Sequence, residues 1–143
     1  MTNCLFVYGT LMRAASASSL GRHERARLEA SGEWLGAATI AGRLYDLGRY
    51  PVLVAPRARH ERVHGEVFRL HTPALIFRWL DIYEGIPPGM TRGAEYERVT
   101  ATARLAAGDT IEAGVYLFAG NVAGLRRLPD GCWRPRDGFP RRP

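Results

Sequence analysis

The sequence contains no lysine, so arginine supplies all 20 of its basic residues. A net charge of +6 is a feature of many nucleic-acid-binding proteins, but a complete replacement of lysine by arginine indicates coding bias rather than a binding surface. The arginines are scattered, apart from Arg126-Arg127 and the tail residues Arg134, Arg136, Arg141 and Arg142. The aromatic-interleaved basic motif of an RNA-binding sheet is missing as well. We therefore interpret the charge as solvated surface and predict no nucleic-acid partner.

Cysteine is scarce, and the two cysteines, Cys4 and Cys132, do not have the spacing of metal ligands. The histidines lack that spacing too: His23, His60, His64 and His71. We predict no metal site and interpret the cysteines as reduced thiols of a cytoplasmic protein. No apolar run approaches the roughly 20 residues of a membrane span, and residues 1–4 lack the basic region of a secretory signal. We therefore expect neither a membrane partner nor a secretory signal.

Several motifs of common enzyme classes are also missing. There is no phosphate-binding loop, no Gly-x-Gly-x-x-Gly turn and no Gly-x-Ser-x-Gly nucleophile elbow. The chain has no internal repeat or linker, and its 143 residues, 46 % of them hydrophobic, favour a single domain over residues 1–143 with a real core. The tail from about Pro129 is rich in Pro, Gly and Arg, so we expect it to be loosely held, apart from Trp133.

The pattern of extended segments predicts an α+β fold. Segment 13–30 is polar and Ala-rich, which predicts only one or two weak helical turns. Gly36 and Gly42 interrupt the longest extended segment, and glycines inside strands indicate bulges or close backbone approach. We therefore expect about six strands in a curved sheet that closes toward a barrel, with helices packed outside. The predicted strands cover residues 5–8, 34–45, 52–55, 63–70, 97–105 and 111–118, the last two joined as a hairpin.

The clearest predicted element is a helix that begins after Thr72. Thr72 is suited to the N-cap, Pro73 to the first helical position and Gly85 to the left-handed position after the last turn. The spacing of the apolar residues predicts one buried stripe along this helix. That stripe consists of Leu75, Ile76, Trp79, Leu80 and Tyr83.

Glu84 closes this helix at the end where a carboxylate is least favourable. The negative end of the helix dipole disfavours a carboxylate there by a few tenths to about 1 kcal/mol. If Glu84 also faces a cleft behind Trp79 and Tyr83, burial would raise its pKa further. A carboxylate with a raised pKa can act as a general base near neutral pH. The alternative is an exposed glutamate that tolerates a small penalty.

A second candidate site element is the turn formed by Tyr8, Gly9, Thr10 and Leu11, directly after the first apolar strand. A strand that ends in a glycine turn can direct consecutive backbone N–H groups at one point and so bind an anion such as a carboxylate. The alternative is a simple turn that ends the strand. Glu66 is a further candidate carboxylate, although a glutamate in a strand more commonly faces solvent or pairs with arginine.

An ordered series of short segments resembles the γ-glutamylcyclotransferase-like, or AIG2-like, family. The resemblance runs from about residue 4 to about residue 120, and the pairing of Tyr-Gly-Thr-Leu with a later Tyr-Glu-Gly is its most specific part. The segments are Phe6-Val7-Tyr8-Gly9-Thr10-Leu11, Tyr50-Pro51, Val63-His64-Gly65-Glu66-Val67-Phe68, Leu80-Asp81-Ile82-Tyr83-Glu84-Gly85, Tyr96-Glu97-Arg98 and Val115-Tyr116.

This resemblance implies a small mixed β-barrel flanked by helices, with a cavity at one end. It implies cyclisation of a γ-glutamyl compound to 5-oxoproline with release of an amine and without a cofactor. The glutamyl-binding loop of the family falls on Tyr8, Gly9, Thr10 and Leu11, and its catalytic glutamate falls on Glu84. Two alternatives stay open: cleavage of γ-glutamylamine crosslinks, and a non-enzymatic module whose cavity binds a small zwitterion. The sequence predicts no oligomeric state.

Overall fold

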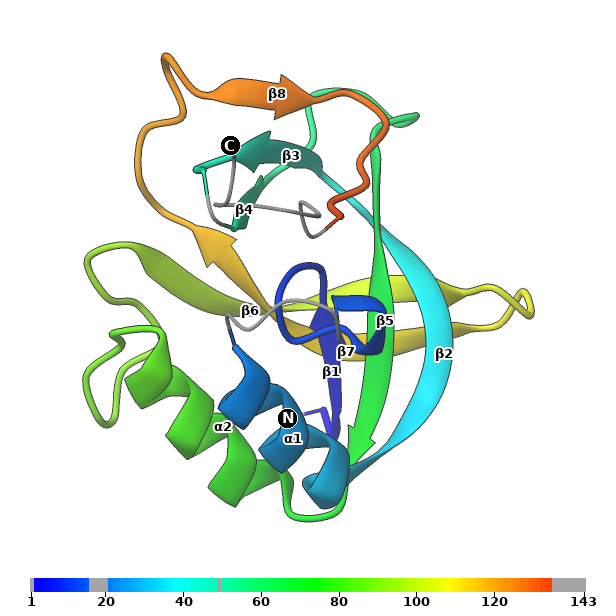
Figure 1. Cartoon of the computed structure of the whole chain (residues 1–143), viewed down its shortest axis with the longest axis vertical. Helices are drawn as coiled ribbons and strands as arrows, with labels where there is room; N and C mark the ends of the chain where they lie inside the picture. Colours follow the sequence, from blue (N-terminus) through cyan, green and yellow to red (C-terminus); the bar gives the residue numbers. More distant parts are fainter. Residues whose placement is uncertain (1, 16–20, 49, 135–143) are drawn as a thin grey trace, which may run out of the picture.

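A computed structural model describes residues 2–15, 21–48 and 50–134 (Figure 1). Within these residues the chain forms a barrel, a smaller sheet and two α-helices. The strands are β1 (Cys4–Val7), β2 (Gly32–Ala41), β3 (Arg43–Asp46), β4 (Pro51–Val54), β5 (Arg62–Leu70), β6 (Tyr96–Leu105), β7 (Thr110–Phe118) and β8 (Arg126–Leu128). The helices are the 3₁₀ turn η1 (Arg13–Ala15), α1 (Arg22–Ser31) and α2 (Pro73–Tyr83).

The barrel closes in the order β1-β5-β2-β6-β7. Its neighbouring strands are antiparallel, except that β7 pairs in parallel with β1 where Gly114 lies opposite Leu5. Gly114 also allows α2 to approach, because a Cβ there would lie 2.9 Å from the Phe77 ring. The mixed barrel with helices outside confirms the predicted fold class.

The long extended segment predicted over residues 34–45 is in fact two strands that belong to different sheets. At Gly42 the chain leaves the barrel and enters the sheet ordered β4-β3-β8, and a Cβ there would lie 2.6 Å from Leu53 Cδ1 and 3.1 Å from the Val54 carbonyl oxygen, so a larger residue would be crowded. The predicted bulge is confirmed, because the register of β2 shifts between Trp34 and Gly36, and Gly36 has a φ of 123°. The described residues contain eight strands rather than about six, because this split adds one strand and β8, which was not predicted, adds another.

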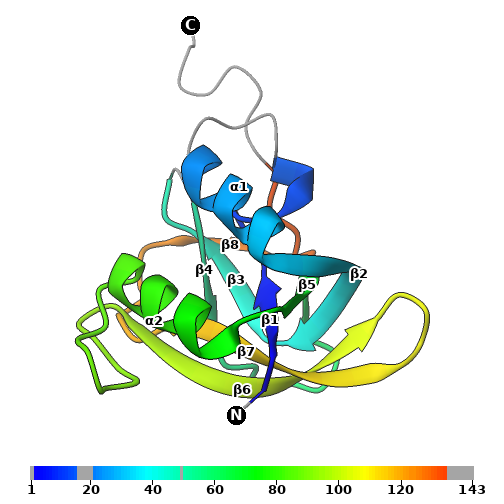
Figure 2. The ribbon, with the colours of Figure 1, turned by 90° about the horizontal axis from the view of Figure 1, so that it is seen from below.

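Helix α1 is longer than the one or two weak turns expected for this region. Its composition is polar, so contacts with the rest of the protein must supply most of its stability. Leu28 is completely buried, and the Arg27 guanidinium lies 4.2 Å from the centre of the Trp79 ring on α2. The two helices lie next to each other in both views of the ribbon (Figures 1 and 2). The tertiary contact explains why the local sequence underestimates this helix.

Helix α2 has its predicted position, but its buried face is rotated from the predicted one. Gly85 has the predicted left-handed φ, 78°, while no side-chain capping bond from Thr72 occurs within the described residues. Leu75 and Tyr83 are 53 % and 43 % exposed, so their assignment to the buried stripe was wrong. The barrel wall is contacted instead by Phe77, which packs over Gly114. The buried residues of α2 are Ile76, Phe77, Leu80 and Asp81.

The core has two parts. One lies between the helices and the barrel and includes Leu28, Phe77 and Leu80. The other lies inside the barrel, around residues such as Phe6 and Ile40. Trp133, the one tail residue expected to be anchored, packs against both parts. Residues 135–143 of the predicted tail lie outside the described residues.

Candidate functional site

A cavity of about 400 Å³ opens between the end of β1, the start of β4 and the C-terminal end of α2. It is lined by both elements that the sequence singled out, the turn after β1 and Glu84. The structure therefore brings Glu84 to the same space as Tyr8, Gly9, Thr10 and Leu11. The remaining lining residues are Phe6, Val7, Tyr50, Pro51, Tyr83, Gly85, Glu95, Tyr96 and Tyr116.

Glu84 is held at the C-cap of α2, where its N–H donates to the Leu80 carbonyl at 2.8 Å. Its side chain is half-buried. Burial raises the pKa of the Glu84 carboxyl to about 7, and the negative charge of Glu95 adds to that increase. The helix dipole favours the same direction, because its negative end lies at this terminus. Glu84 can therefore both accept and release a proton near neutral pH.

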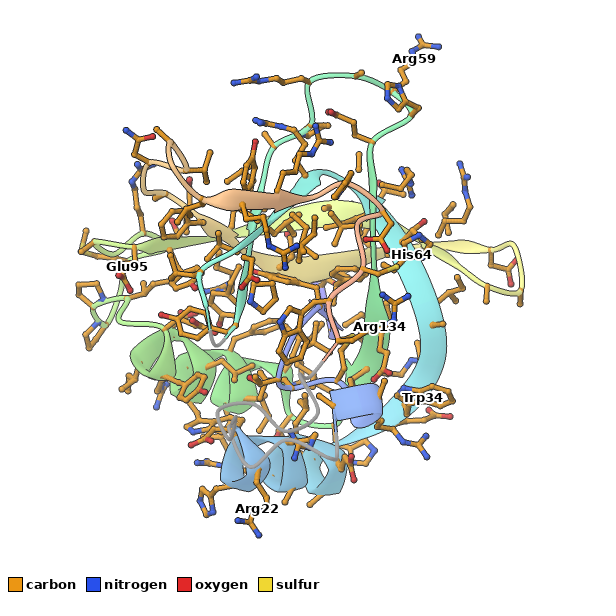
Figure 3. All side chains as sticks on the ribbon, turned by 45° about the horizontal axis from the view of Figure 1, so that its top comes forward. Arg22, Trp34, Arg59, His64, Glu95 and Arg134 are labelled. Atoms are coloured by element: carbon orange, nitrogen blue, oxygen red, sulfur yellow. The ribbon has the colours of Figure 1, made fainter. Side chains whose placement is uncertain are left out.

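The cavity is acidic although the chain as a whole is basic. Among its described lining residues, the charged side chains are Glu84 and Glu95, and no arginine reaches it. Glu95 is exposed and lies at the outer edge of the molecule in the connection that leads into β6 (Figure 3). The side chains of the cavity therefore favour a ligand with a cationic group, whereas an anionic group would have to be bound by the backbone.

Tyrosine dominates the walls of this cavity. All six tyrosines lie in the described part of the chain, and five of them line it. The Tyr8 hydroxyl donates to the Tyr116 carbonyl at 2.6 Å, and the Tyr116 hydroxyl donates to Asp81 Oδ1 at 2.7 Å. Burial raises the pKa of the hydroxyls of Tyr8, Tyr96 and Tyr116, so they remain protonated donors at physiological pH.

A partly buried ion pair supports the wall of the cavity behind Tyr116. Arg98 binds Asp81 in a bidentate manner, with Nε–Oδ1 and Nη2–Oδ2 distances of 2.8 and 3.1 Å, and its guanidinium lies 5.1 Å from the Phe77 ring centre. Hydrogen bonding to Asp81 raises the pKa of Arg98. Sequence analysis missed this role of Asp81. Its position one turn before Glu84, on the face that carries Leu80, was the available signal.

The turn after β1 is packed closely against β4. A Cβ at Gly9 would lie 2.9 Å from Pro51 Cδ, and the Met12 N–H donates to the Gly9 carbonyl at 3.0 Å. Neither the Thr10 N–H nor the Leu11 N–H has a hydrogen-bond acceptor among residues 2–15, 21–48 and 50–134. Both residues line the cavity, so these donors are available to a bound anion.

Glu66, the other candidate carboxylate, does not line this cavity. It is buried in β5, where it accepts hydrogen bonds from the N–H groups of Arg13 at 2.6 Å and Ala14 at 3.2 Å. The expected alternatives, a strand glutamate that faces solvent or pairs with an arginine side chain, do not describe it either. It contacts the backbone immediately beyond the turn. The sequence did not predict these contacts, because Glu66 and residues 13–14 are far apart along the chain.

The histidines do not contribute to the cavity beside Glu84. His60 and His64 line a second cavity, of about 450 Å³, together with Arg43, Arg62 and Arg127. No group of three or more His, Cys, Asp or Glu residues in the described chain has the arrangement of a metal site. In the same residues, no helix is long and apolar enough to cross a membrane.

Comparison with known proteins gives a family match and a shared fold. A family model described as "Gamma-glutamyl cyclotransferase, AIG2-like" matches residues 5–135, whereas no curated protein sequence matches the chain. An AIG2-like protein from Mus musculus has 21 % identity and a TM-score of 0.64, with 94 % of this chain and 95 % of that chain covered. The c4763 protein of uropathogenic E. coli has 23 % identity and a TM-score of 0.59, with 93 % of each chain covered.

A longer relative contains the same fold. YkqA from Bacillus subtilis has 22 % identity and a TM-score of 0.64, with 93 % of this chain covered. The chain spans only 40 % of the length of YkqA. At these identities the solved structures establish the fold that the chain shares with them.

Proposed function

The chain belongs to the gamma-glutamyl cyclotransferase, AIG2-like family, and on that basis we propose that it converts a γ-glutamyl amide or amine compound to 5-oxoproline with release of the amine. The observation that carries the proposal is the position of Glu84. Its carboxyl has a pKa of about 7 and lines the same cavity as the turn with available N–H groups. A γ-glutamyl group carries an ammonium and a carboxylate on one carbon, which is the charge pattern that such a cavity can bind.

In the bound substrate, the α-carboxylate accepts hydrogen bonds from the backbone of residues 8–11, and the α-ammonium faces Glu84. The γ-carbonyl is folded back toward the α-nitrogen. Because the two reacting groups are held next to each other, a well-ordered site can lower the barrier to ring closure by several kcal/mol. The tyrosine walls, held in place by bonds such as that from Tyr8 to the Tyr116 carbonyl, shape the cavity around the folded substrate.

The reaction moves two protons from the α-nitrogen to the leaving nitrogen, and Glu84 carries both in turn. As a carboxylate it takes a proton from the α-ammonium, and the free amine attacks the γ-carbonyl carbon of the same molecule. A new C–N bond closes the five-membered ring, and the bond from that carbon to the leaving nitrogen breaks. Glu84 then gives its proton to the departing amine, takes the second proton from the ring nitrogen and passes it to the same amine, which leaves as an ammonium. These steps use the substrate and one side chain, with no metal or cofactor.

Glu95 provides a basis for discrimination among leaving groups. Because it adds a second negative charge to the cavity, we expect a leaving amine that carries a positive charge to be accepted better than one that carries a carboxylate. γ-Glutamylamines with a second ammonium group are therefore expected to react faster than glutathione, whose leaving dipeptide is acidic.

The test is a screen for 5-oxoproline release from γ-glutamyl amino acids, γ-glutamylamines and glutathione. Turnover of at least one compound, with faster rates for cationic leaving groups, is the expected result. If no γ-glutamyl compound reacts while 5-oxoproline or L-glutamate still binds, the protein is a binding module that uses the same cavity, and the cyclotransferase proposal is wrong.

A further inference from the structure

Two buried side chains of opposite charge contact the backbone of the turn or of η1, which directly follows it, without lining the cavity. They are Arg25 on α1 and Glu66 on β5, which are 5 % and 6 % exposed. We propose that Arg25 and Glu66 are positioning residues that fix the turn so that the N–H groups of Thr10 and Leu11 face the ligand. This proposal rests on the proposed function only for the identity of that ligand, a carboxylate.

Arg25 determines the orientation of the peptide between Thr10 and Leu11. Its Nη1 donates to the Thr10 carbonyl at 2.6 Å. A trans peptide is planar, and its N–H points in the direction opposite to its carbonyl. When Arg25 holds the Thr10 carbonyl toward α1, the Leu11 N–H must point away from α1. Since Leu11 lines the cavity, we infer that this N–H points into it.

The preceding peptide is oriented in the same way by the chain itself. The Gly9 carbonyl accepts from the Met12 N–H at 3.0 Å, so the Thr10 N–H points away from Met12. Because Thr10 and Leu11 both line the cavity, we infer that both donors lie on the ligand side, each fixed through the carbonyl of its own peptide. A pair of adjacent N–H groups is the arrangement by which backbone concavities bind anions.

Glu66 holds the other end of the turn. Its carboxylate accepts from the N–H groups of Arg13 and Ala14 at 2.6 and 3.2 Å, just after the turn ends. In the β1–β5 ladder, Glu66 lies opposite Val7, the last residue before the turn begins. One strand residue is therefore next to both ends of the turn, which fixes its span against the barrel.

The burial of these charges requires an explanation, because a buried charge is costly unless hydrogen bonds compensate for it. For both residues the described contacts include the backbone of the segment that follows β1. Among the described residues the third buried charged side chain is Asp81, and it also supports a cavity wall, through Tyr116. If Arg25, Glu66 and Asp81 served only to stabilise the fold, they would not all need to support the surroundings of the same cavity.

The test measures binding of 5-oxoproline and L-glutamate by calorimetry and by amide NMR shifts, on the full chain. Arg25→Met removes the donor, and Glu66→Gln replaces one acceptor oxygen by a donor that opposes an N–H. Each is expected to weaken probe binding about tenfold or more, the effect of losing a charged hydrogen bond. Arg25→Lys, which keeps a cationic donor, should recover part of the affinity. The pH at which Glu84 titrates should not move in any of them.

Val63→Ala is the matched control, because Val63 lies on β5 but belongs to the core cluster inside the barrel, whereas Leu11 of the turn belongs to the other cluster. It should lower the melting temperature and leave probe affinity unchanged. Wild-type affinity in folded Arg25→Met and Glu66→Gln, or a loss that only follows the melting temperature as in Val63→Ala, would overturn the proposal.

The wild-type chain provides a second measurement if those variants do not fold. At saturating 5-oxoproline, the amides of Thr10 and Leu11 should show large shifts, and the absence of shifts at both would overturn the proposal. Binding with these shifts but without turnover of any γ-glutamyl compound would refute the cyclotransferase proposal alone. Turnover together with unaffected variants would refute the positioning proposal alone.

Discussion

At the scale of single residues, the two carboxylates of the cavity affect each other. Glu95 is one of the causes of the raised pKa of Glu84, after burial. Removing its charge in Glu95→Gln should lower the pKa of Glu84, so that the basic form persists to lower pH. The acidic limb of the kcat/KM profile, expected near pH 7 in the wild type, should therefore move to lower pH. Profiles measured at constant ionic strength check this.

Glu97→Gln is the control for that experiment, because Glu97 is two residues away in the sequence but does not line the cavity. Its charge is already paired with Arg92 at 3.3 Å. An unchanged acidic limb in Glu95→Gln, or an equal displacement in Glu97→Gln, would show that Glu95 does not influence the pKa of Glu84.

The same raised pKa has a consequence for stability. In the folded chain, Glu84 binds its proton up to about pH 7, against an ordinary value of 4.5. The folded state therefore holds more protons than the unfolded state between these values, and the wild type loses stability as pH rises through that window. The Glu84→Gln variant does not lose stability in this way, because glutamine does not titrate. Its free energy of unfolding should exceed that of the wild type by up to about 3 kcal/mol at pH 8.

That difference should nearly vanish at pH 4, where Glu84 is protonated in both states. Urea unfolding at the two pH values measures it. A difference between the proteins that does not vary with pH would mean that Glu84 has an ordinary pKa in the folded chain.

At the scale of elements, the position of the turn against β4 depends on the absence of a side chain at Gly9. A Cβ there would lie 2.9 and 3.0 Å from Pro51 Cδ and Cγ, so Gly9→Ala should push the turn away from β4 and weaken 5-oxoproline binding. Because Pro51→Ala removes both ring atoms, the double variant should recover part of the affinity. Calorimetry on the single and double variants tests this coupling, and equal affinities in the two would contradict it.

The elements also show what local sequence determines. The bounds of α2 were predicted correctly from Thr72, Pro73 and Gly85, because signals at helix ends are local in the sequence. The position of Glu84 at the end of this helix followed from those bounds. The rotation of its buried face depends on Gly114 of β7, which no local pattern reveals. The split of residues 34–45 into two sheets occurs at Gly42, which lies close to Leu53 of the neighbouring strand β4, a proximity that the local pattern of residues 34–45 does not reveal. For the same reason, sequence analysis recognised Glu66 as a candidate but not its contacts, and missed Arg25.

At the scale of the whole molecule, we predict that the positive net charge does not make the chain a nucleic-acid-binding protein. A chain with a net charge of +6 should bind short duplexes weakly at low salt and lose that binding near physiological salt. A salt titration with RNA and DNA, on the full chain and on a chain that ends at Arg134, measures this. Submicromolar binding at physiological salt that survives the truncation would overturn the interpretation and favour a binding module over an enzyme.

The closure of the sheet toward a barrel was predictable from the glycines inside its strands. The family was predictable from the order of short sequence motifs. The acidic character of the cavity could not be predicted in this way, because it depends on which of the scattered charged residues the fold places away from the cavity. No arginine is among the described lining residues, although arginine is the most frequent charged residue of the chain. Composition alone therefore does not determine the charge of the one surface that the proposed function uses.

The central claim is that Glu84 is the general acid and base, and Glu84→Gln tests it most directly. Glutamine keeps the shape of the side chain and removes its basicity. With a γ-glutamyl compound that the wild type turns over, we predict that kcat falls about 100-fold or more, while the dissociation constant for 5-oxoproline changes little. Wild-type turnover in Glu84→Gln would contradict the account.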